Sequence, residues 1–169
     1  NLYDISSLYK EGGYSFRDMN DLPDDTVIST YYKFNLCKPI TSNCTTPTEV
    51  GAYHEALFSG ESIGACTKLG TIENPELKVV EYQDRSAVNV TYVGGDSCFY
   101  TTDNYTTFGE KPYIITFLIY CGFDNTATFT QSKNNGNDVT DCSPRFEIFH
   151  PAGCVATASG VGGIIGGGR

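Results

Sequence analysis

The chain has 169 residues and a mass of 18.4 kDa, which fits one domain that can bury a sizeable core. Hydrophobic residues make up 40% of the chain and charged residues 18%, so disorder over its whole length is excluded. It has 11 Lys and Arg against 20 Asp and Glu, a net charge of −9 and no cluster of cations, which disfavours binding to nucleic acid or to an anionic membrane surface.

Short strands separated by turn residues are predicted along most of the chain, because Thr, Val, Ile and Tyr dominate its periodic stretches. In chain order, the sequence predicts an edge segment over 1–25 with turns at 12–13 and 23–25, a strand over 27–37, a loop over 44–66 with a short helix near 52–57, a hairpin of 77–82 and 86–92, a tight turn at 94–96, a buried strand over 113–120, and strands over 123–131 and 145–149. Such spacing indicates an all-β sandwich or barrel.

The last residues differ from the rest. Residues 156–169 (ATASGVGGIIGGGR) are too small to pack a core, so the predicted domain covers residues 1–155. The tail is interpreted as a Gly-rich stalk, an ordinary flexible tail or the start of a truncated membrane segment. No signal peptide is visible, and the chain is interpreted as a processed mature one. A membrane is therefore expected to be reached only through a segment beyond this chain.

The cysteines and glycosylation sequons point to an oxidising compartment. None of the seven Cys has the spacing of a metal site, and no cofactor is expected. Sequons occur at Asn43, Asn89 and Asn104. Together they predict a secreted or lumenal chain with disulfides and its own N-linked glycans. The odd Cys is either free or paired with a residue outside the chain.

No constellation of an enzyme is found. His54 and His150 have no nucleophile at motif spacing, and neither GxSxG nor HExxH occurs. His54 is predicted to be solvated, and both are interpreted as surface or packing residues. Exposed Tyr such as Tyr100, Tyr105 and Tyr113 could stack on sugars or form a protein interface, but packing within the barrel is favoured over that alternative.

A set of ordered motifs resembles one known family, the mannose 6-phosphate receptor homology (MRH) domains. The matching segments are residues 3–8 (YDISSL), similar to YDLSPL; 32–40 (YKFNLCKPI), similar to YxFNxCxPL; 92–98 (YVGGDSC), similar to YxGGDxC; 115–121, similar to an ITF-type strand that ends in Cys; and 142–154, similar to CxYxFEWxTxxAC. The resemblance covers residues 1–155. It implies a flattened β-barrel of two roughly orthogonal antiparallel sheets.

The resemblance also implies a disulfide pattern. Cys44 would pair with Cys66, Cys98 with Cys142, and Cys121 with Cys154. Cys37 would be the odd one, because its partner in many family members is a Cys at the N-terminus and none precedes it here. Each bridge would contribute about 2–4 kcal/mol to stability by restricting the unfolded chain.

The sugar-binding residues of the family are not matched. Its phosphomannosyl lectins hold mannose with a Gln, an Arg, a Glu and a Tyr. Thr67 stands at the Gln position, and Tyr113 or Ile114 at the Arg position. Lys111 is the nearest cation, but Lys cannot donate in the fixed fork of Arg.

The other two positions differ as well. Residues 122–141 contain no Glu, and Asn134 comes nearest to its spacing; Pro144 replaces the Tyr. The net charge of −9 also disfavours a phosphate ligand. An altered site would use residues from the following set: Thr67, Lys111, Tyr113, Gln131, Asn134 and Pro144.

Two hypotheses of function follow, neither of them enzymatic. In the first, the chain is a receptor-like domain of a membrane-anchored glycoprotein and binds glycoprotein cargo through an altered, non-phosphomannosyl site. In the second, it is an accessory or structural subunit whose barrel has lost lectin activity and binds proteins. Either would reside in the lumen of the secretory pathway, at an endosomal or Golgi membrane or at the cell surface.

Overall fold

The computed structural model describes residues 3–18, 28–73, 75–82, 85–101, 108–132 and 142–155. Several residues singled out in the sequence lie outside them: Asn104, Tyr105, Asn134 and the tail over 156–169.

Thirteen strands and two short 3-10 helices make up the described chain. In order they are η1 (Ser6–Leu8), β1 (Tyr14–Arg17), β2 (Ile28–Phe34), β3 (Ile40–Thr41), β4 (Glu49–Val50), β5 (Ala52–Phe58), β6 (Glu61–Gly70), β7 (Glu76–Tyr82), β8 (Arg85–Tyr92), β9 (Ser97–Thr101), β10 (Phe108–Pro112), β11 (Ile115–Cys121), β12 (Thr130–Gln131), β13 (Arg145–His150) and η2 (Pro151–Gly153). Among them is no helix with the length and apolar character needed to cross a membrane.

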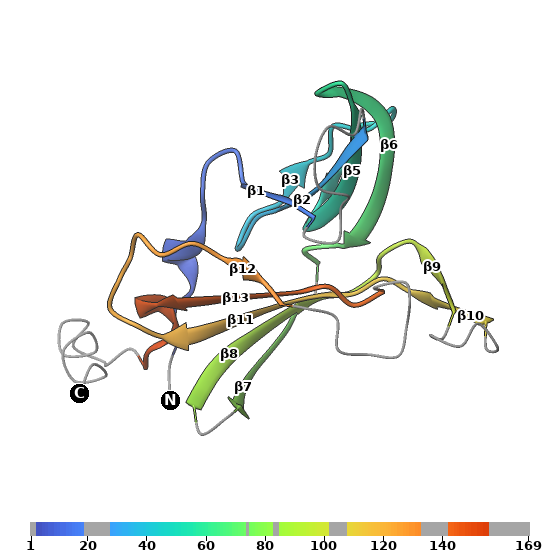
Figure 1. Ribbon diagram of the computed structural model, residues 1–169. Helices are drawn as coiled ribbons and strands as arrows, with labels where there is room; N and C mark the ends of the chain where they lie inside the picture. The colour runs from blue at the N-terminus through green and yellow to red at the C-terminus, as the bar shows by residue number, and fades with distance from the viewer. Residues whose placement is uncertain are drawn as a thin grey trace.

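Two main sheets form the body of the domain. One has four strands in the order β1-β2-β5-β6, and the other has five in the order β12-β13-β11-β8-β7. All their pairs are antiparallel except β11 and β13, which run in parallel. The four-stranded sheet runs across the five-stranded one (Figure 1), and the hairpin of β9 and β10 extends from one end. The predicted all-β fold of two crossing sheets is confirmed.

Two sequence predictions are wrong in detail. The region predicted as a loop with a short helix is the hairpin of β5 and β6, closed by Ser59 and Gly60, which both have positive φ. The sequence of β5 shows no alternation of buried and exposed residues, because Tyr53 and Glu55 on its outer face are buried as well. The strand predicted over 123–131 is reduced to the two residues of β12, and turns precede it. The hairpin of β7 and β8 is confirmed.

An aromatic core joins the inner faces of the two sheets. Phe34 of β2 is fully buried, and its ring lies 4.6 Å from that of Phe117 in β11 and 5.1 Å from that of Phe146 in β13. Tyr14 stacks on Phe34 at 5.2 Å from the neighbouring strand. Alternation along each strand places these rings on one side, so the sheets are held by aromatic packing.

Three disulfides each join a strand to a segment outside the strands. They join Cys44 to Cys66, Cys98 to Cys142, and Cys121 to Cys154. These are the three pairs that the resemblance implies. Cys37 is a free, exposed thiol with a φ of 72°.

Tyr92, the last residue of β8, connects the core to the loop after β2. Its side chain is 1% exposed, and its hydroxyl donates a hydrogen bond of 2.8 Å to the carbonyl oxygen of Asn35. A Cβ at Gly51 or Gly70 would come within 2.6 Å of the Tyr92 side chain, so the backbone passes close to it on two sides. Burial raises the pKa of Tyr92 far above its usual value, and it stays protonated as a donor.

We expect Tyr92→Phe to lower the free energy of unfolding by about 1–2 kcal/mol, because the buried carbonyl of Asn35 loses its donor. Urea unfolding followed by far-ultraviolet circular dichroism measures the change. Tyr9→Phe is the matched control, since Tyr9 is exposed. An equal loss in both variants would contradict the assigned role.

His150 closes β13 and caps η2. It is 6% exposed, and its Nδ1 accepts a hydrogen bond of 3.0 Å from the amide of Ala152. Burial lowers the pKa of His150 below its usual 6.5, while the charge of Asp124 acts in the opposite direction. The neutral ring is therefore the form that the fold favours.

Because the folded chain disfavours protonated His150, we expect its free energy of unfolding to fall on acidification. The unfolded chain binds the proton more readily than the folded chain, so this contribution is complete above about pH 6.5 and is lost as the pH falls further. His150→Asn keeps a side-chain acceptor but does not titrate, and should show a smaller loss of stability between about pH 7.5 and pH 5.5. Identical pH dependence in both proteins would refute this role of His150.

Candidate functional site

The inner face of the four-stranded sheet changes from aromatic to polar along its strands. Tyr32 of β2 pairs with His54 of β5, and His54 pairs with Thr67 of β6. Directly opposite residues of antiparallel strands share a face, so all three point inward. Tyr32 marks the end of the core, since its ring meets Phe146 of the other sheet at 5.4 Å. His54 and Thr67, both half-buried, continue the row beyond the core.

A carboxylate and an imidazole are paired in this row. Asp18 follows β1, and its amide donates to the carbonyl oxygen of Thr30, which continues the pairing of β1 with β2. Asp18 Oδ2 lies 3.2 Å from His54 Nε2, with side-chain exposures of 14% and 26%. The rings of His54 and Tyr32 are 4.7 Å apart. The prediction that His54 is solvated is therefore wrong: it is held between a carboxylate and an aromatic ring.

We call Asp18, Tyr32, His54 and Thr67 the inner polar patch. It combines a carboxylate paired with an imidazole and an aliphatic hydroxyl, beside the buried ring of Tyr32. The partial burial of Asp18 and His54 strengthens their hydrogen bonds relative to those of solvated groups. Such a set suits recognition of a ligand that carries several hydroxyl groups.

Tyr113, the residue at the predicted Arg position, is tied to the strand that carries Thr67. The amide of Asp96 donates to the carbonyl of Lys68 at 2.8 Å, and the amide of Tyr113 donates to the carbonyl of Asp96 at 2.9 Å. Asp96 Oδ2 in turn accepts from the amide of Lys68 at 2.8 Å. The turn at 94–96 thus joins β6 to the segment that precedes β11.

Pro144 lies on the next segment of the same end. The amide of Thr116 donates to its carbonyl at 3.1 Å, and the amide of Ile114 donates to the carbonyl of Cys142 at 3.2 Å. Pro144 is buried, and Tyr113 packs against the core. The structure therefore brings the backbone segments of Thr67, Tyr113 and Pro144 to one end of the domain. The side chains of Tyr113 and Pro144 there are packed rather than charged.

The remaining predicted residues lie elsewhere or are not described. Lys111 is on β10 with its Nζ 4.6 Å from the ring centre of Tyr100, a cation–π contact within the projecting hairpin. Gln131 pairs with Phe146 at the edge of the five-stranded sheet. Asn134 lies outside the described residues.

A hydroxyl, an imidazole and a carboxylate in one row are also the composition of a nucleophilic triad. Within the described residues, no side-chain hydrogen bond joins the Thr67 hydroxyl to His54, as activation of the hydroxyl would require. In the same part of the chain, no group of three His, Cys, Asp or Glu residues could hold a metal ion. The inner polar patch is thus arranged as a set of hydrogen-bonding groups.

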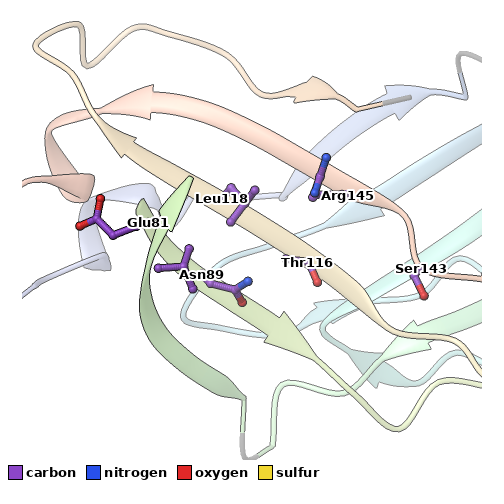
Figure 2. A pocket seen from close by; sticks show the side chains of 7 residues that line it. Glu81, Asn89, Thr116, Leu118, Ser143 and Arg145 are labelled. Atoms are coloured by element: carbon purple, nitrogen blue, oxygen red, sulfur yellow. The ribbon is translucent and has the colours of Figure 1, made fainter. Parts of the chain in front are cut away.

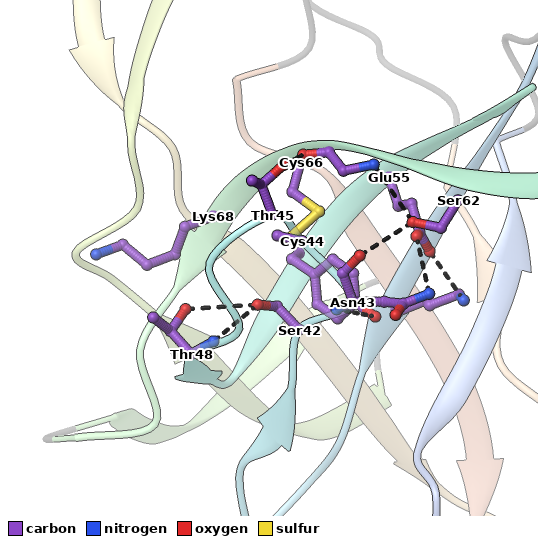
Figure 3. Close-up of a disulfide and its surroundings, with 12 residues drawn as sticks. Ser42, Asn43, Cys44, Thr45, Thr48, Glu55, Ser62, Cys66 and Lys68 are labelled. Atoms are coloured by element: carbon purple, nitrogen blue, oxygen red, sulfur yellow. Dashed lines mark hydrogen bonds and ion pairs between the residues drawn. A yellow bond between two sulfur atoms is a disulfide. The ribbon is translucent and has the colours of Figure 1, made fainter.

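A second polar cluster lies on the outer face of the same sheet (Figure 3). Glu55 is fully buried, with Lys33 Nζ 2.9 Å from its Oε2. Asn43 Nδ2 donates to Glu55 Oε1 at 3.3 Å, and the Asn43 amide donates to the Tyr53 hydroxyl at 3.2 Å. The Ser62 hydroxyl donates to the Asn43 carbonyl at 3.0 Å. The disulfide next to Asn43 fixes the same loop, so the cluster serves as its anchor.

The sequence offered little sign of Asp18 and His54 as partners. They lie 36 positions apart, and their meeting depends on the pairing of β1 with β2 and of β2 with β5. Recognition of β5 as a strand would have been the signal, because it places His54 on the face of Tyr32.

Comparison with known proteins gives a limited result. No protein-family model matches the sequence, and no curated protein matches it. Among solved structures, the fold is similar to "Solution structure of the MRH domain of Yos9 complexed with alpha3,alpha6-Man5", with a TM-score of 0.42 and 11% identity over 72% of this chain and 69% of that one. These values do not assign the chain to a family.

We expect Lys33→Met to lower the free energy of unfolding by about 2–3 kcal/mol, because it leaves the Glu55 carboxylate buried without its cation. The double variant with Glu55→Gln should recover most of this loss, since it removes the charge as well. Urea unfolding of the two single variants and the double variant measures the coupling. Additive losses would show that the pair does not interact.

Proposed function

We propose that this chain is a non-enzymatic, receptor-like domain of the secretory pathway that binds the glycans of glycoprotein cargo. Its site is the inner polar patch, and it is altered relative to a phosphomannosyl lectin. The observation that carries the proposal is that the Asp18–His54 pair lies beside Thr67. Thr67 stands at the sequence position where the family that this chain resembles places its Gln.

The disulfides support two parts of the proposal: passage of the chain through the secretory pathway, and its resemblance to MRH domains. Three bridges are typical of chains that fold in an oxidising compartment. Their pairing is one of 105 arrangements that leave one of seven Cys unpaired, and it is the one that the motif resemblance implies. The resemblance and the bridges therefore support the same receptor-like interpretation.

The chemistry of the patch favours a neutral sugar. The Thr67 hydroxyl can donate or accept, and the Asp18–His54 pair adds a carboxylate and an imidazole beside it. Tyr113 and Pro144 leave no cation at their positions, and the net charge of −9 opposes a phosphate group. Plain mannose-type glycans are therefore a better candidate than phosphomannosyl ones.

A second candidate function is protein binding by a barrel without lectin activity. Phe99 and Phe108 are 71% and 72% exposed on the hairpin of β9 and β10. Phe108 pairs with Thr101, two residues from Phe99, so both rings lie on one face. An exposed pair of aromatic rings on a projecting hairpin is suited to contact with another protein, as an accessory subunit requires.

Glycan-array binding of the purified domain tests the first candidate. The domain is made in glycosylating cells and probed with phosphomannosyl and plain high-mannose glycans, before and after removal of its own glycans. We expect binding to plain glycans that free sugar competes away, weakened roughly 5- to 150-fold by His54→Ala or Thr67→Val, because each removes a hydroxyl partner.

Lys38→Ala is the control, since Lys38 is an exposed cation whose Nζ lies 5.0 Å from the ring centre of Tyr9, outside the patch. Absence of binding to every glycan would refute the lectin proposal. A partner captured by the wild-type chain and lost with Phe99→Ser and Phe108→Ser would then favour the accessory role.

A further inference from the structure

The outer face of the five-stranded sheet carries a pocket that the inner polar patch does not use (Figure 2). Its volume is about 350 Å³, within the roughly 300–1,000 Å³ of ligand sites. Its lining mixes polar and apolar groups: Val80, Glu81, Asn89, Thr116, Leu118, Ser143 and Arg145. The pocket crosses four neighbouring strands or their ends, from β7 to β13.

The base of this pocket is apolar, which is unusual for an outer face. Leu118 is 4% exposed and belongs to a small buried cluster with Ala87 and Tyr120, against which Val80 packs. Thr116 and Arg145 are paired across β11 and β13, beside this base. A ligand with one apolar face would match the base of the pocket, and hydroxyl or amide groups at its edge would match the polar side chains beside that base.

One lining residue, Asn89, is a glycosylation sequon in the middle of β8. The Thr91 hydroxyl donates to Asn89 Oδ1 at 2.6 Å, and it lies 3.1 Å from the Thr116 hydroxyl. The carbonyl side of the amide is therefore engaged along the strand. Within the described residues, no hydrogen bond involves Asn89 Nδ2, the atom to which a sugar is attached.

Asn43, the other described sequon, is arranged differently. Its Nδ2 donates to the buried Glu55, and the residue is exposed on a loop. A glycan on Asn43 would therefore extend into solvent, whereas one on Asn89 begins inside a pocket.

We propose that the pocket seats the first N-acetylglucosamine of a glycan carried on Asn89 of this same chain. The sugar ring covers Leu118, and its hydroxyl and acetamide groups meet Thr116, Ser143 and Arg145. The outer face of the sheet is then shielded by the chain's own glycan. The inference rests on the proposed passage through the secretory pathway, and it does not depend on sugar binding at the inner polar patch.

The covalent step is ordinary N-glycosylation, before folding. Asn89 Nδ2 loses one hydrogen and forms a bond to C1 of the sugar. The donor is an oligosaccharide linked to a lipid pyrophosphate; the bond from C1 to the phosphate oxygen breaks, and the lipid pyrophosphate leaves with the proton. Folding then closes the pocket around the attached sugar.

The test compares release of the glycans from native and denatured chain. The full chain is made in glycosylating cells, and occupancy at each sequon is read by enzymatic deglycosylation in ¹⁸O water with peptide mass spectrometry. A time course with an endoglycosidase follows. We expect Asn89 to be occupied and its glycan to be released at least ~10-fold more slowly from native than from denatured chain, because release requires local opening. Asn43 should show no such protection.

Arg145→Ala should speed release at Asn89 from the native chain. Arg85→Ala is the matched control, because Arg85 lies on β8, the strand that carries Asn89, and its guanidinium stacks 5.2 Å from the Phe149 ring, outside the pocket. Urea unfolding verifies that both variants are folded. An unoccupied Asn89, equal release from native and denatured chain, or no effect of Arg145→Ala would each overturn the proposal. None of these outcomes bears on glycan-array binding, so the two proposals can fail separately.

Discussion

The packing around Phe34 is the contact on which both sheets depend. Five aromatic rings from three other strands and a loop surround it: Tyr14, Phe16, Phe117, Phe129 and Phe146, at 4.6–6.0 Å. Because aromatic rings bury much surface and interlock edge to face, this cluster fixes how the sheets cross. The inner polar patch begins where the cluster ends, at Tyr32, and its position therefore follows from the core.

Much of the fold could be predicted from the sequence. β-branched and aromatic runs identified β2, β8 and β11, and the motif resemblance implied the disulfide pairing. The hairpin of β5 and β6 could not be recognised, because Tyr53 and Glu55 are buried on the outer face as fully as Ala52 is on the inner one. Burial on both faces removes the alternation of period two by which a strand is read.

Less of the candidate site could be predicted. The motif resemblance predicts the positions of Thr67, Tyr113 and Pro144, and backbone hydrogen bonds link their segments at one end of the domain. It does not predict the pairing of Asp18 with His54, because these residues lie 36 positions apart and their contact leaves no trace in local spacing. Their contact is a property of register, which depends on the whole sheet and on its turns.

The order of the five-stranded sheet constrains how the domain is made. β13, the last strand described, lies between β12 and β11, which precede it in the chain. During synthesis, the long edge of β11 therefore stays open until residues 145–150 have emerged. Cys121 likewise waits for Cys154 to close its bridge. A nascent chain of this protein would thus rely on chaperones to cover that edge, and a truncation within β13 would leave an aggregation-prone fragment rather than a smaller domain.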